Sequence, residues 1–379
     1  MGSIERRERD GRVTWLARWR DPDGRQRKRS FRRRVDADRY LTGIRSALLE
    51  GAYVDPSAGR ETVGTWAAAW LGSRVHLKPK TRASYGSLLR TRVLPRWRSV
   101  PLSRVTYTDV SAWVAAMRAQ GLSASRTRQS YHLLTSMLDD AVRAGKLARN
   151  PAAGVDLPRL PTSARRYLTH EQVQALAEAC GEDGLIVLVL SYCGLRWGEL
   201  AALRGRNVDL LRGRIEVVES VTDVDGRMTF GSPKSHAHRS VPLPAFLRDG
   251  MAQRLTGLAP DALVFASRAG TPLRVQSFRR RGFDRATTAV GLDGLTPHEL
   301  RHTAASLAIA AGANVKAVQR MLGHASGAMT LDGYAGLFGD DLDVVAARLD
   351  AAHGKIKAAV PPACPVVSVS GLAKRRASH

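Results

Sequence analysis

Four short segments in the second half of the chain carry residues that can act together on a phosphate. They are CGLRWGEL, SPKSHAHRSVPL, TPHELRH and MLGHASGAMTLDGYAGLF, in that order. The first and third each contain an arginine, Arg196 and Arg301. A planar guanidinium group binds two phosphate oxygens at once, and two such groups can neutralise the extra charge of a pentavalent transition state without a metal ion. The pattern therefore indicates phosphoryl transfer.

The other polar residues of these segments fit roles around such a phosphate. Tyr334 beside it can act as a nucleophile while His298 manages the phenol proton. His298 and Arg301 are three residues apart, so a helix would place both on one face. Lys234 is the only lysine in residues 147–315, at an expected turn between strands, from which it can reach a departing oxygen as an acid.

Together, the segments resemble the catalytic domain of the tyrosine recombinase family, phage integrases in particular. The resemblance covers roughly residues 165–340 and includes the words GLRWGEL, HELRH, MLGH and TLDGYAG. Six polar positions also match the family in order: Arg196, Lys234, His298, Arg301, His324 and Tyr334. The first half of the chain is similar, through looser signals, to members that have an arm-site domain and a helical core-binding domain.

The resemblance implies a reaction and a role for each matching residue. Tyr334 would attack a scissile phosphodiester, form a 3′-phosphotyrosyl bond and free a 5′-hydroxyl, so that the bond energy is conserved in the new ester. Neither ATP, a divalent metal nor another cofactor is implied. Arg196 and Arg301 would clamp the phosphate, and His298 would assist proton transfer. Lys234 would be the leaving-group acid, and His324 would donate to a nonbridging oxygen. Glu199 would support these residues.

Several of these residues also allow other interpretations. HELRH matches HExxH, in which two histidines bind zinc and the glutamate is the general base of a protease. That function leaves the basic charge of the chain unexplained, and we interpret His302 as a packing or supporting histidine. His324 follows an expected helix over 315–322 and its terminating glycine, so it can simply cap helix carbonyls. Tyr334 can be a core or surface aromatic, and Lys234 a solvated hairpin lysine.

The overall charge indicates a polyanionic partner. Lys and Arg number 59 against 34 Asp and Glu, which gives a formal +25 and a pI near 11.1. This balance is expected of a protein that binds nucleic acid or an anionic membrane face. The apolar stretches are too short to span a bilayer. We therefore expect double-stranded DNA rather than a membrane as the partner, and a cytoplasmic location. The resemblance to phage integrases implies that this is the bacterial cytoplasm, in association with the nucleoid.

The cysteines give no sign of a metal site or a disulfide framework. The chain has three, Cys180, Cys193 and Cys364, and they form no CxxC pair. We expect no bound metal, and we expect Cys180 and Cys193 to be buried as small apolar residues.

The N-terminal region, residues 1–58, is predicted to be a small basic arm-site domain. Alternating apolar residues in VTWLARWR, a DPDG turn and the basic RQRKRSF predict a hairpin, and a helix is expected over 36–50. Residues 1–34 contain 13 Lys or Arg and 5 Asp or Glu, a net +8. This sheet either reads DNA in a groove or presents a merely solvated basic face. The candidate DNA-binding residues are Arg18, Arg20, Arg27, Lys28 and Arg29.

The next region is predicted to be an all-α core-binding domain, residues 61–155. Its helical patterns cover 63–71, 81–93, 108–120 and 123–144. The segment ARNPAAGVDLPRLPTS then interrupts any helix and places a boundary near residue 160.

The remainder is predicted to be a helix-dominated α+β catalytic domain, residues 160–350. Short β segments at 215–230 and 240–244 indicate a small meander, and a last helix is expected over 340–352. The tail, residues 351–379, has little periodicity and is expected to be disordered when alone. The predicted fold class is thus multidomain and mainly α, with small β-sheets.

The leading hypothesis is a site-specific DNA recombinase, an integrase of a phage or mobile element. The resemblance implies that it acts on DNA attachment sites as a homotetramer on two duplexes, with a host DNA-bending protein and an excision factor as further partners. Two rival functions remain open, a type IB topoisomerase with the same chemistry and a noncatalytic DNA-binding protein descended from an integrase.

Overall fold

The chain forms two compact units, described in a computed structural model. One comprises residues 1–164 with 222–229, and the other residues 165–221 with 230–379. The structure describes residues 2–50, 53, 55, 58–161, 166–233, 238–324, 326 and 350. In these ranges no helix is both long and apolar enough to cross a membrane.

Some predicted features lie outside these described residues. They are Lys234, Tyr334, the tail over 351–379 and, apart from Asp350, the helix expected over 340–352.

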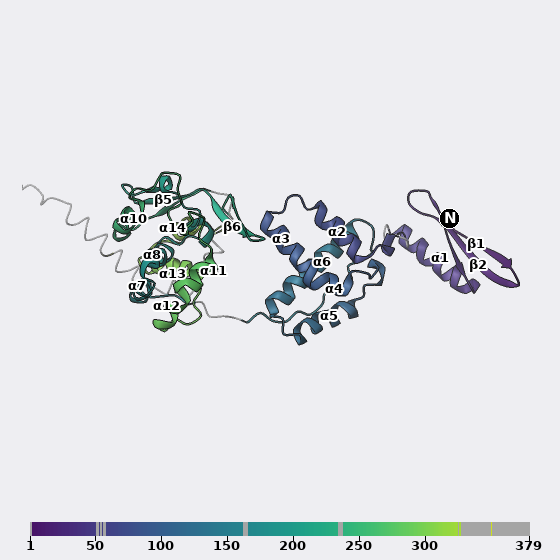
Figure 1. Cartoon of the computed structure of the whole chain (residues 1–379). Helices are drawn as coiled ribbons and strands as arrows, with labels where there is room; N and C mark the ends of the chain where they lie inside the picture. The colour runs from purple at the N-terminus through teal and green to yellow at the C-terminus, as the bar shows by residue number, and fades with distance from the viewer. Residues whose placement is uncertain are drawn as a thin grey trace, which may run out of the picture. The chain divides into compact units, whose positions relative to one another are not determined.

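The N-terminal region is a three-stranded antiparallel sheet packed against one helix (Figure 1). The elements are β1 (Ser3–Arg9), β2 (Arg12–Arg20), β3 (Gln26–Phe31) and α1 (Arg34–Leu49). Strands β2 and β3 form the predicted hairpin. The sequence pattern does not predict β1, because SIERRER lacks alternating apolar residues; its charged side chains instead pair across the sheet, as Glu5 does with Arg18 at 2.6 Å.

The alternation of β2 separates the two faces of this sheet. Ala17 and Trp19 are buried against Ala37 and Leu41 of α1, and the Trp19 indole donates to the Tyr53 hydroxyl at 2.9 Å. The even-numbered residues of β2 therefore lie on the face that α1 leaves uncovered.

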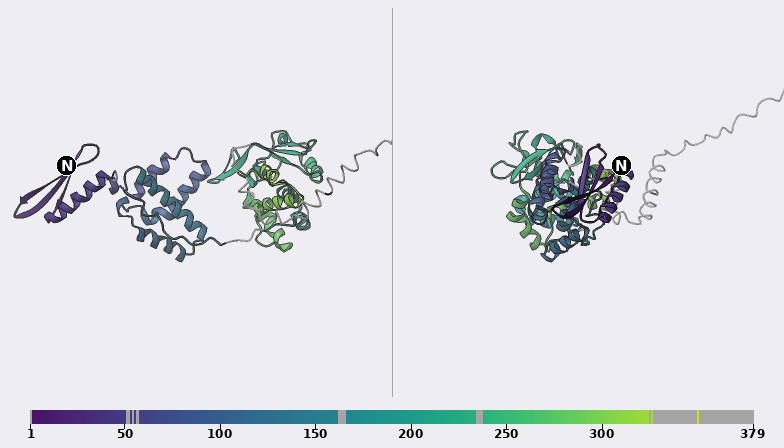
Figure 2. Two further views of the ribbon diagram at one scale, coloured as in Figure 1. Left: turned by 180° about the vertical axis from the view of Figure 1, so that it is seen from behind. Right: turned by 90° about the vertical axis from the view of Figure 1, so that its right-hand side faces the viewer.

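A separate helical bundle follows, visible in both views of Figure 2 as the blue helices. Its N-terminal caps are hydroxyl side chains at three helices, among them Ser123, which accepts from the Arg126 N–H. Three of the four predicted helices begin and end within two residues of their predicted bounds. The helices are α2 (Val63–Ser73), α3 (Pro79–Leu88), α4 (Leu94–Trp97), α5 (Tyr107–Ala119) and α6 (Ala124–Arg143).

The helix predicted over 81–93 runs further than expected. It continues from α3 through a π-helical turn, Leu89–Val93, into α4. Pro95 does not stop this helix, although proline lacks an N–H and in an α-helix its ring collides with the carbonyl four residues earlier. The wider π turn accommodates the proline, and the chain stays helical up to Trp97, whose side chain is fully buried.

The second unit is built around α8 (Gly184–Cys193). Seven of its ten residues are buried, and α7 (His170–Ala179) and α13 (Pro297–Ala310) pack against it, as Figure 1 shows. Cys193 is buried as predicted, whereas Cys180 is only partly buried; burial raises the pKa of the Cys193 thiol to about 12. The other helices are α9 (Trp197–Leu200), α10 (Arg248–Leu255), α11 (Val275–Phe278), α12 (Asp284–Ala289) and α14 (Val315–Leu322).

The small β structure of this unit is not a simple meander. Strands β4 (Val208–Asp209), β5 (Arg214–Val217) and β8 (Arg239–Pro242) form one antiparallel sheet, in the order β4-β5-β8. Strands β6 (Ser220–Val224) and β7 (Arg227–Gly231) form a separate pair, most of which, residues 222–229, is grouped with the first compact unit. The break falls between β5 and β6, so β8 pairs with β5 rather than with its sequence neighbour β7.

Truncating Leu190 in the centre of α8 should strongly destabilise the second unit. Leu190 is 1% exposed, and Leu190→Ala should lower the free energy of unfolding by about 2–5 kcal/mol through the cavity it leaves. Leu211, in the same unit, is 94% exposed, so Leu211→Ala is the matched control and should change stability by less than about 0.5 kcal/mol. Urea unfolding followed by circular dichroism measures both; equal losses would contradict this packing.

Candidate active site

Arg196 is positioned by a sharp end to α8. Gly194 takes a left-handed conformation (φ 63°) that stops the helix. A Cβ on Gly194 would lie 2.9 Å from a Leu322 methyl carbon and 3.3 Å from Cβ of Ala304, so only glycine lets these segments approach so closely. The chain then turns, and Arg196 becomes the N-cap residue of α9.

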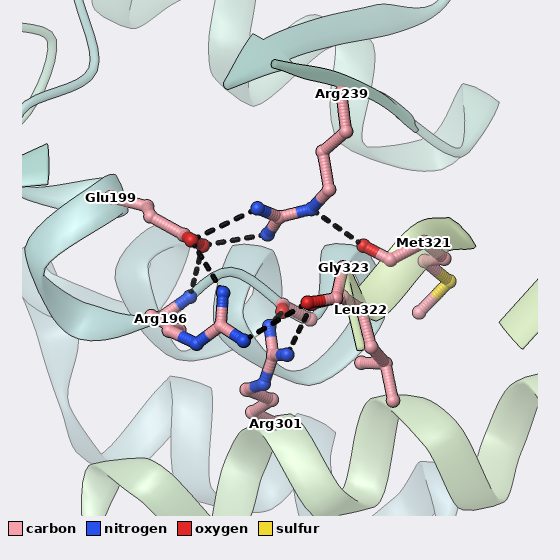
Figure 3. Close-up of polar contacts among 8 residues, drawn as sticks. Arg196, Glu199, Arg239, Arg301, Met321, Leu322 and Gly323 are labelled. Carbon is pink, nitrogen blue, oxygen red and sulfur yellow. Dashed lines mark hydrogen bonds and ion pairs between the residues drawn. The ribbon is translucent and has the colours of Figure 1, made fainter. Parts of the chain in front are cut away.

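Glu199 binds two arginines with one buried carboxylate. The residue is 3% exposed. Arg196 donates its backbone N–H to Oε2 at 2.8 Å and its Nη1 to Oε1 at 2.9 Å. Arg239 donates Nη1 and Nη2 to the same two oxygens at 2.9 and 2.6 Å, a bidentate pair. Figure 3 shows this carboxylate between the two guanidinium groups.

Glu199 is held ionised by this arrangement. Burial is the largest single influence and favours the neutral acid, but the hydrogen bonds and charges of Arg239, and then of Arg196, outweigh it. The pKa of Glu199 is therefore lowered below its ordinary value.

Arg301 enters the same region from the first turns of α13. That helix begins at Pro297 with a capping box between Thr296 and Glu299, which turns the Arg301 side chain inward; the residue is 4% exposed. Its Nη1 donates to the Gly194 carbonyl and its Nη2 to the Leu322 carbonyl. The two predicted clamp arginines thus meet where the ends of α8 and α14 come together.

The C-terminal end of α14 is held by arginines from three elements. Gly323 ends the helix in the left-handed region (φ 62°). In Figure 3, three successive carbonyls accept hydrogen bonds from three guanidinium groups. The pairs are Met321 O with Arg239 Nε at 3.0 Å, Leu322 O with Arg301 Nη2, and Gly323 O with Arg196 Nη2 at 3.2 Å.

His324 follows directly after this helix end and is partly buried. Its backbone N–H donates to the Gln319 carbonyl at 3.2 Å, so the main chain of His324 caps α14. Burial, followed by the charges of Arg301 and Arg196, lowers the pKa of the imidazole to about 4. The ring is therefore neutral at neutral pH and carries one N–H donor.

The two histidines of HELRH, His298 and His302, are less buried than Arg301 between them. His298 is exposed at the start of α13, and its ring centroid lies 5.1 Å from that of His302 in an edge-to-face arrangement. The glutamate of the motif, Glu299, caps its own helix by accepting from the Thr296 N–H at 2.7 Å and its hydroxyl at 2.9 Å. A capping carboxylate is a poor general base, and the described residues contain no cluster of three metal-ligating side chains.

The structure brings together Arg196, Glu199, Arg301 and His324 of the predicted site and adds Arg239, which sequence reasoning missed. Within SHAHRSVPL, Arg239 begins β8 and shares a face with the buried Val241. This two-residue periodicity of the strand was the sequence signal that could have identified Arg239. Lys234 and Tyr334 lie outside the described residues, so their predicted places in the site remain predictions.

The candidate DNA-binding residues of the N-terminal sheet lie on both of its faces. Arg18, Arg20 and Lys28 share the face that α1 leaves uncovered. Arg27 lies on the helix side, where it pairs with Asp21 at 2.9 Å and with Asp55 at 2.6 Å. Arg29 also lies there, with its guanidinium 4.8 Å from the centre of the Tyr40 ring.

Comparison with known proteins identifies the class of protein. The fold is that of the multidomain tyrosine recombinases. The chain superposes on one chain of a structure of a lambda integrase tetramer bound to a Holliday junction. The TM-score is 0.58 and the sequence identity 21%, and the match covers 84% of this chain and 92% of the lambda integrase chain. The multidomain, mainly helical fold with small sheets is therefore confirmed.

Sequence comparison finds similar proteins and one matching domain family. Residues 166–338 match the model of the phage integrase family. The chain is 28% identical over 348 residues to the prophage phiRv2 integrase of Mycobacterium tuberculosis, covering 88% of this chain and 91% of that protein. It is 27% identical over 272 residues to the tyrosine recombinase XerC of Vibrio cholerae, covering 69% and 84%. Residues 166–338 therefore match a phage integrase family domain, and most of the chain is similar in sequence to phage and prophage integrases and to the tyrosine recombinase XerC.

The lowered pKa of His324 predicts a pH-dependent stability. Its imidazole titrates near 4 in the folded chain and near 6.5 when unfolded, so the unfolded chain binds the proton more readily. The stability that the neutral ring contributes is complete above pH 6.5 and is lost as pH falls from about 6.5 to 4. Between pH 7 and pH 5 the free energy of unfolding should therefore fall less in His324→Gln than in the wild type, because glutamine does not titrate.

Urea unfolding at the two pH values measures this difference, and histidine-selective NMR of the full chain gives the midpoint directly. A His324 ring that titrates near 6.5 in the folded protein would contradict the burial and the arginine contacts described here.

Proposed function

We propose that this chain is a site-specific DNA recombinase, an integrase of a phage or mobile element, that cleaves and rejoins DNA through a 3′-phosphotyrosyl intermediate. The observation that carries the proposal is the meeting of Arg196 and Arg301 at the end of α14, beside a neutral His324. With Arg239 and Glu199 included, the group carries three positive charges and one negative charge. This excess suits one phosphodiester.

The charge of the site fits the reaction. In the proposed step, the Tyr334 oxygen bonds to phosphorus while the bond from phosphorus to the 5′ oxygen breaks. His298 assists removal of the phenol proton, and Lys234 protonates the departing oxygen. Negative charge grows on the nonbridging oxygens, where Arg196 and Arg301 stabilise it and His324 donates one hydrogen bond. The guanidinium groups supply the charge that a divalent metal would, and the phosphotyrosyl ester conserves the energy that ATP would supply.

The three hydrophobic cores suggest a division of labour along the chain. We assign arm-site binding to residues 1–58, core-site binding to 61–155 and catalysis to 160–350. The partners would be double-stranded attachment sites, bound by a homotetramer on two duplexes, as the lambda integrase structure is a tetramer bound to a Holliday junction. A host DNA-bending protein and an excision factor would assist, on the bacterial nucleoid.

Replacing Tyr334 by phenylalanine should abolish covalent capture of DNA while retaining binding, because only the attacking oxygen is lost. A supercoiled plasmid that carries the DNA flanking this gene is incubated with the protein in EDTA and quenched with detergent. Protein-linked DNA should form with the wild type and with the control Tyr107→Phe, which removes the hydroxyl of a half-exposed tyrosine in the helical bundle. An adduct that persists in Tyr334→Phe would exclude this nucleophile, and binding without any adduct would favour a noncatalytic protein.

Basic residues on the uncovered sheet face should contribute to DNA binding more than those beside α1. Arg20→Ala should weaken binding of the flanking DNA and lower the slope of log affinity against log salt by about 0.9 for one lost phosphate contact. Arg39→Ala is the matched control, because Arg39 is equally an exposed arginine but lies on α1. Fluorescence anisotropy at several salt concentrations measures both, and equal effects would show that the sheet face has no special part in binding.

A further inference from the structure

We propose that Arg239 is a positioning residue of the recombinase site, which holds the phosphate-binding Arg196 and the end of α14 in one geometry through Glu199 and the Met321 carbonyl. The inference rests on the proposed function and extends it to a residue outside the six matching positions. Arg239 belongs to β8, a different element from those that carry Arg196 and Arg301.

The first observation is that all three guanidinium nitrogens of Arg239 donate hydrogen bonds. Both terminal nitrogens bind the two oxygens of Glu199, and Nε binds Met321 O at 3.0 Å. The side chain is 8% exposed. Only a planar group with donors on two edges can join a carboxylate on one side to a carbonyl on the other. Lysine would keep the charge but lose this geometry.

The second observation is the fit between Arg239 and the glycine that ends α14. A Cβ on Gly323 would lie 3.0 Å from Arg239 Cδ and 3.2 Å from its Nε. The glycine is thus required both by its left-handed backbone and by the arginine packed against it. Arg239 therefore contacts the residue directly before His324.

The third observation is the shared carboxylate. Glu199 orients the Arg196 guanidinium and also caps the backbone of Arg196, and Arg239 in turn fixes both Glu199 oxygens. Arg196 also donates to the Gly323 carbonyl, two residues beyond the Met321 carbonyl that Arg239 binds. A shift of Arg239 would therefore move the carboxylate, the Arg196 guanidinium and the helix end together. Misplacement by about 1 Å is enough to slow an enzyme about 100-fold.

The test compares the full-length wild type with Arg239→Lys and a matched control, Arg254→Lys. Arg254 is also an arginine of the second unit, bound through Nε to the Val264 carbonyl at 2.8 Å, but it does not contact the site. The substrate is a nicked duplex, made from the flanking DNA, that traps the covalent intermediate. We expect Arg239→Lys to form the Tyr334-dependent adduct about 100-fold more slowly with unchanged DNA affinity, and Arg254→Lys to match the wild type.

A second substrate separates positioning from a general structural role. A methylphosphonate at the scissile position lacks one charged nonbridging oxygen, so it depends less on the arginine clamp. If Arg239 acts through Arg196, the deficit of Arg239→Lys should shrink on this substrate. Wild-type rates in Arg239→Lys, or an equal deficit on both substrates, would overturn the proposal.

Two further measurements keep the outcome decisive. If Arg239→Lys does not fold, the double variant Glu199→Met with Arg239→Met removes this ion pair without leaving either partner buried alone. It also removes the Glu199 contacts to Arg196, so a deficit at least as large is expected, with the same shrinkage. Histidine-selective NMR without DNA should show moved His324 ring signals in Arg239→Lys and unmoved ones in Arg254→Lys. A wild type that forms no adduct counts against the proposed function, whereas unmoved His324 signals count against Arg239.

Discussion

The buried carboxylate of Glu199 is the interaction on which the rest of the site depends. Two guanidinium groups a few ångströms apart repel each other by several kcal/mol even at an effective dielectric constant near 20. Glu199 lies between Arg196 and Arg239 and accepts from both, which turns a repulsive pair into a connected network. The end of α14 adds three carbonyl dipoles of the right sign. The three guanidinium groups can therefore lie close together in the folded chain, because the carboxylate and the three carbonyl groups offset their repulsion.

Much of the site could be predicted because its residues stand at helix ends that local sequence determines. Gly194 and Gly323 mark the ends of α8 and α14, and the Thr296 capping box marks the start of α13. Arg196, Arg301 and His324 were identified by their residue types and by the resemblance to the family, and these helix ends are what places them together in the structure. Arg239 could not be identified in this way, because nothing in the sequence SHAHRS relates it to its partners, which are 40 and 82 residues away.

The fold was predictable to a similar degree, and the failures share a cause. Periodicity located the helices of the first unit and, in the second, the helix over 315–322, yet the chain remains helical past Pro95 through a π-helical turn. Strand β1 has no apolar alternation, and β8 pairs with β5 across an intervening hairpin. For β1 and β8, pairing with another strand decides the structure. Charge counting has the same limit in the N-terminal sheet, where Arg27 pairs with acids and Arg29 covers an aromatic ring.

The use of arginine throughout this network has a consequence for regulation by acidity. Guanidinium groups remain charged over the whole range in which proteins are folded, and the carboxylate among them has its pKa lowered. The frame that holds the site is therefore insensitive to moderate acidification. His324, which directly follows the end of α14, is the histidine whose pKa these arginines and burial lower to about 4. The arginines and Glu199 thus fix the geometry of the site, whereas His324 can change its protonation state. Protonation can therefore change while the geometry stays constant.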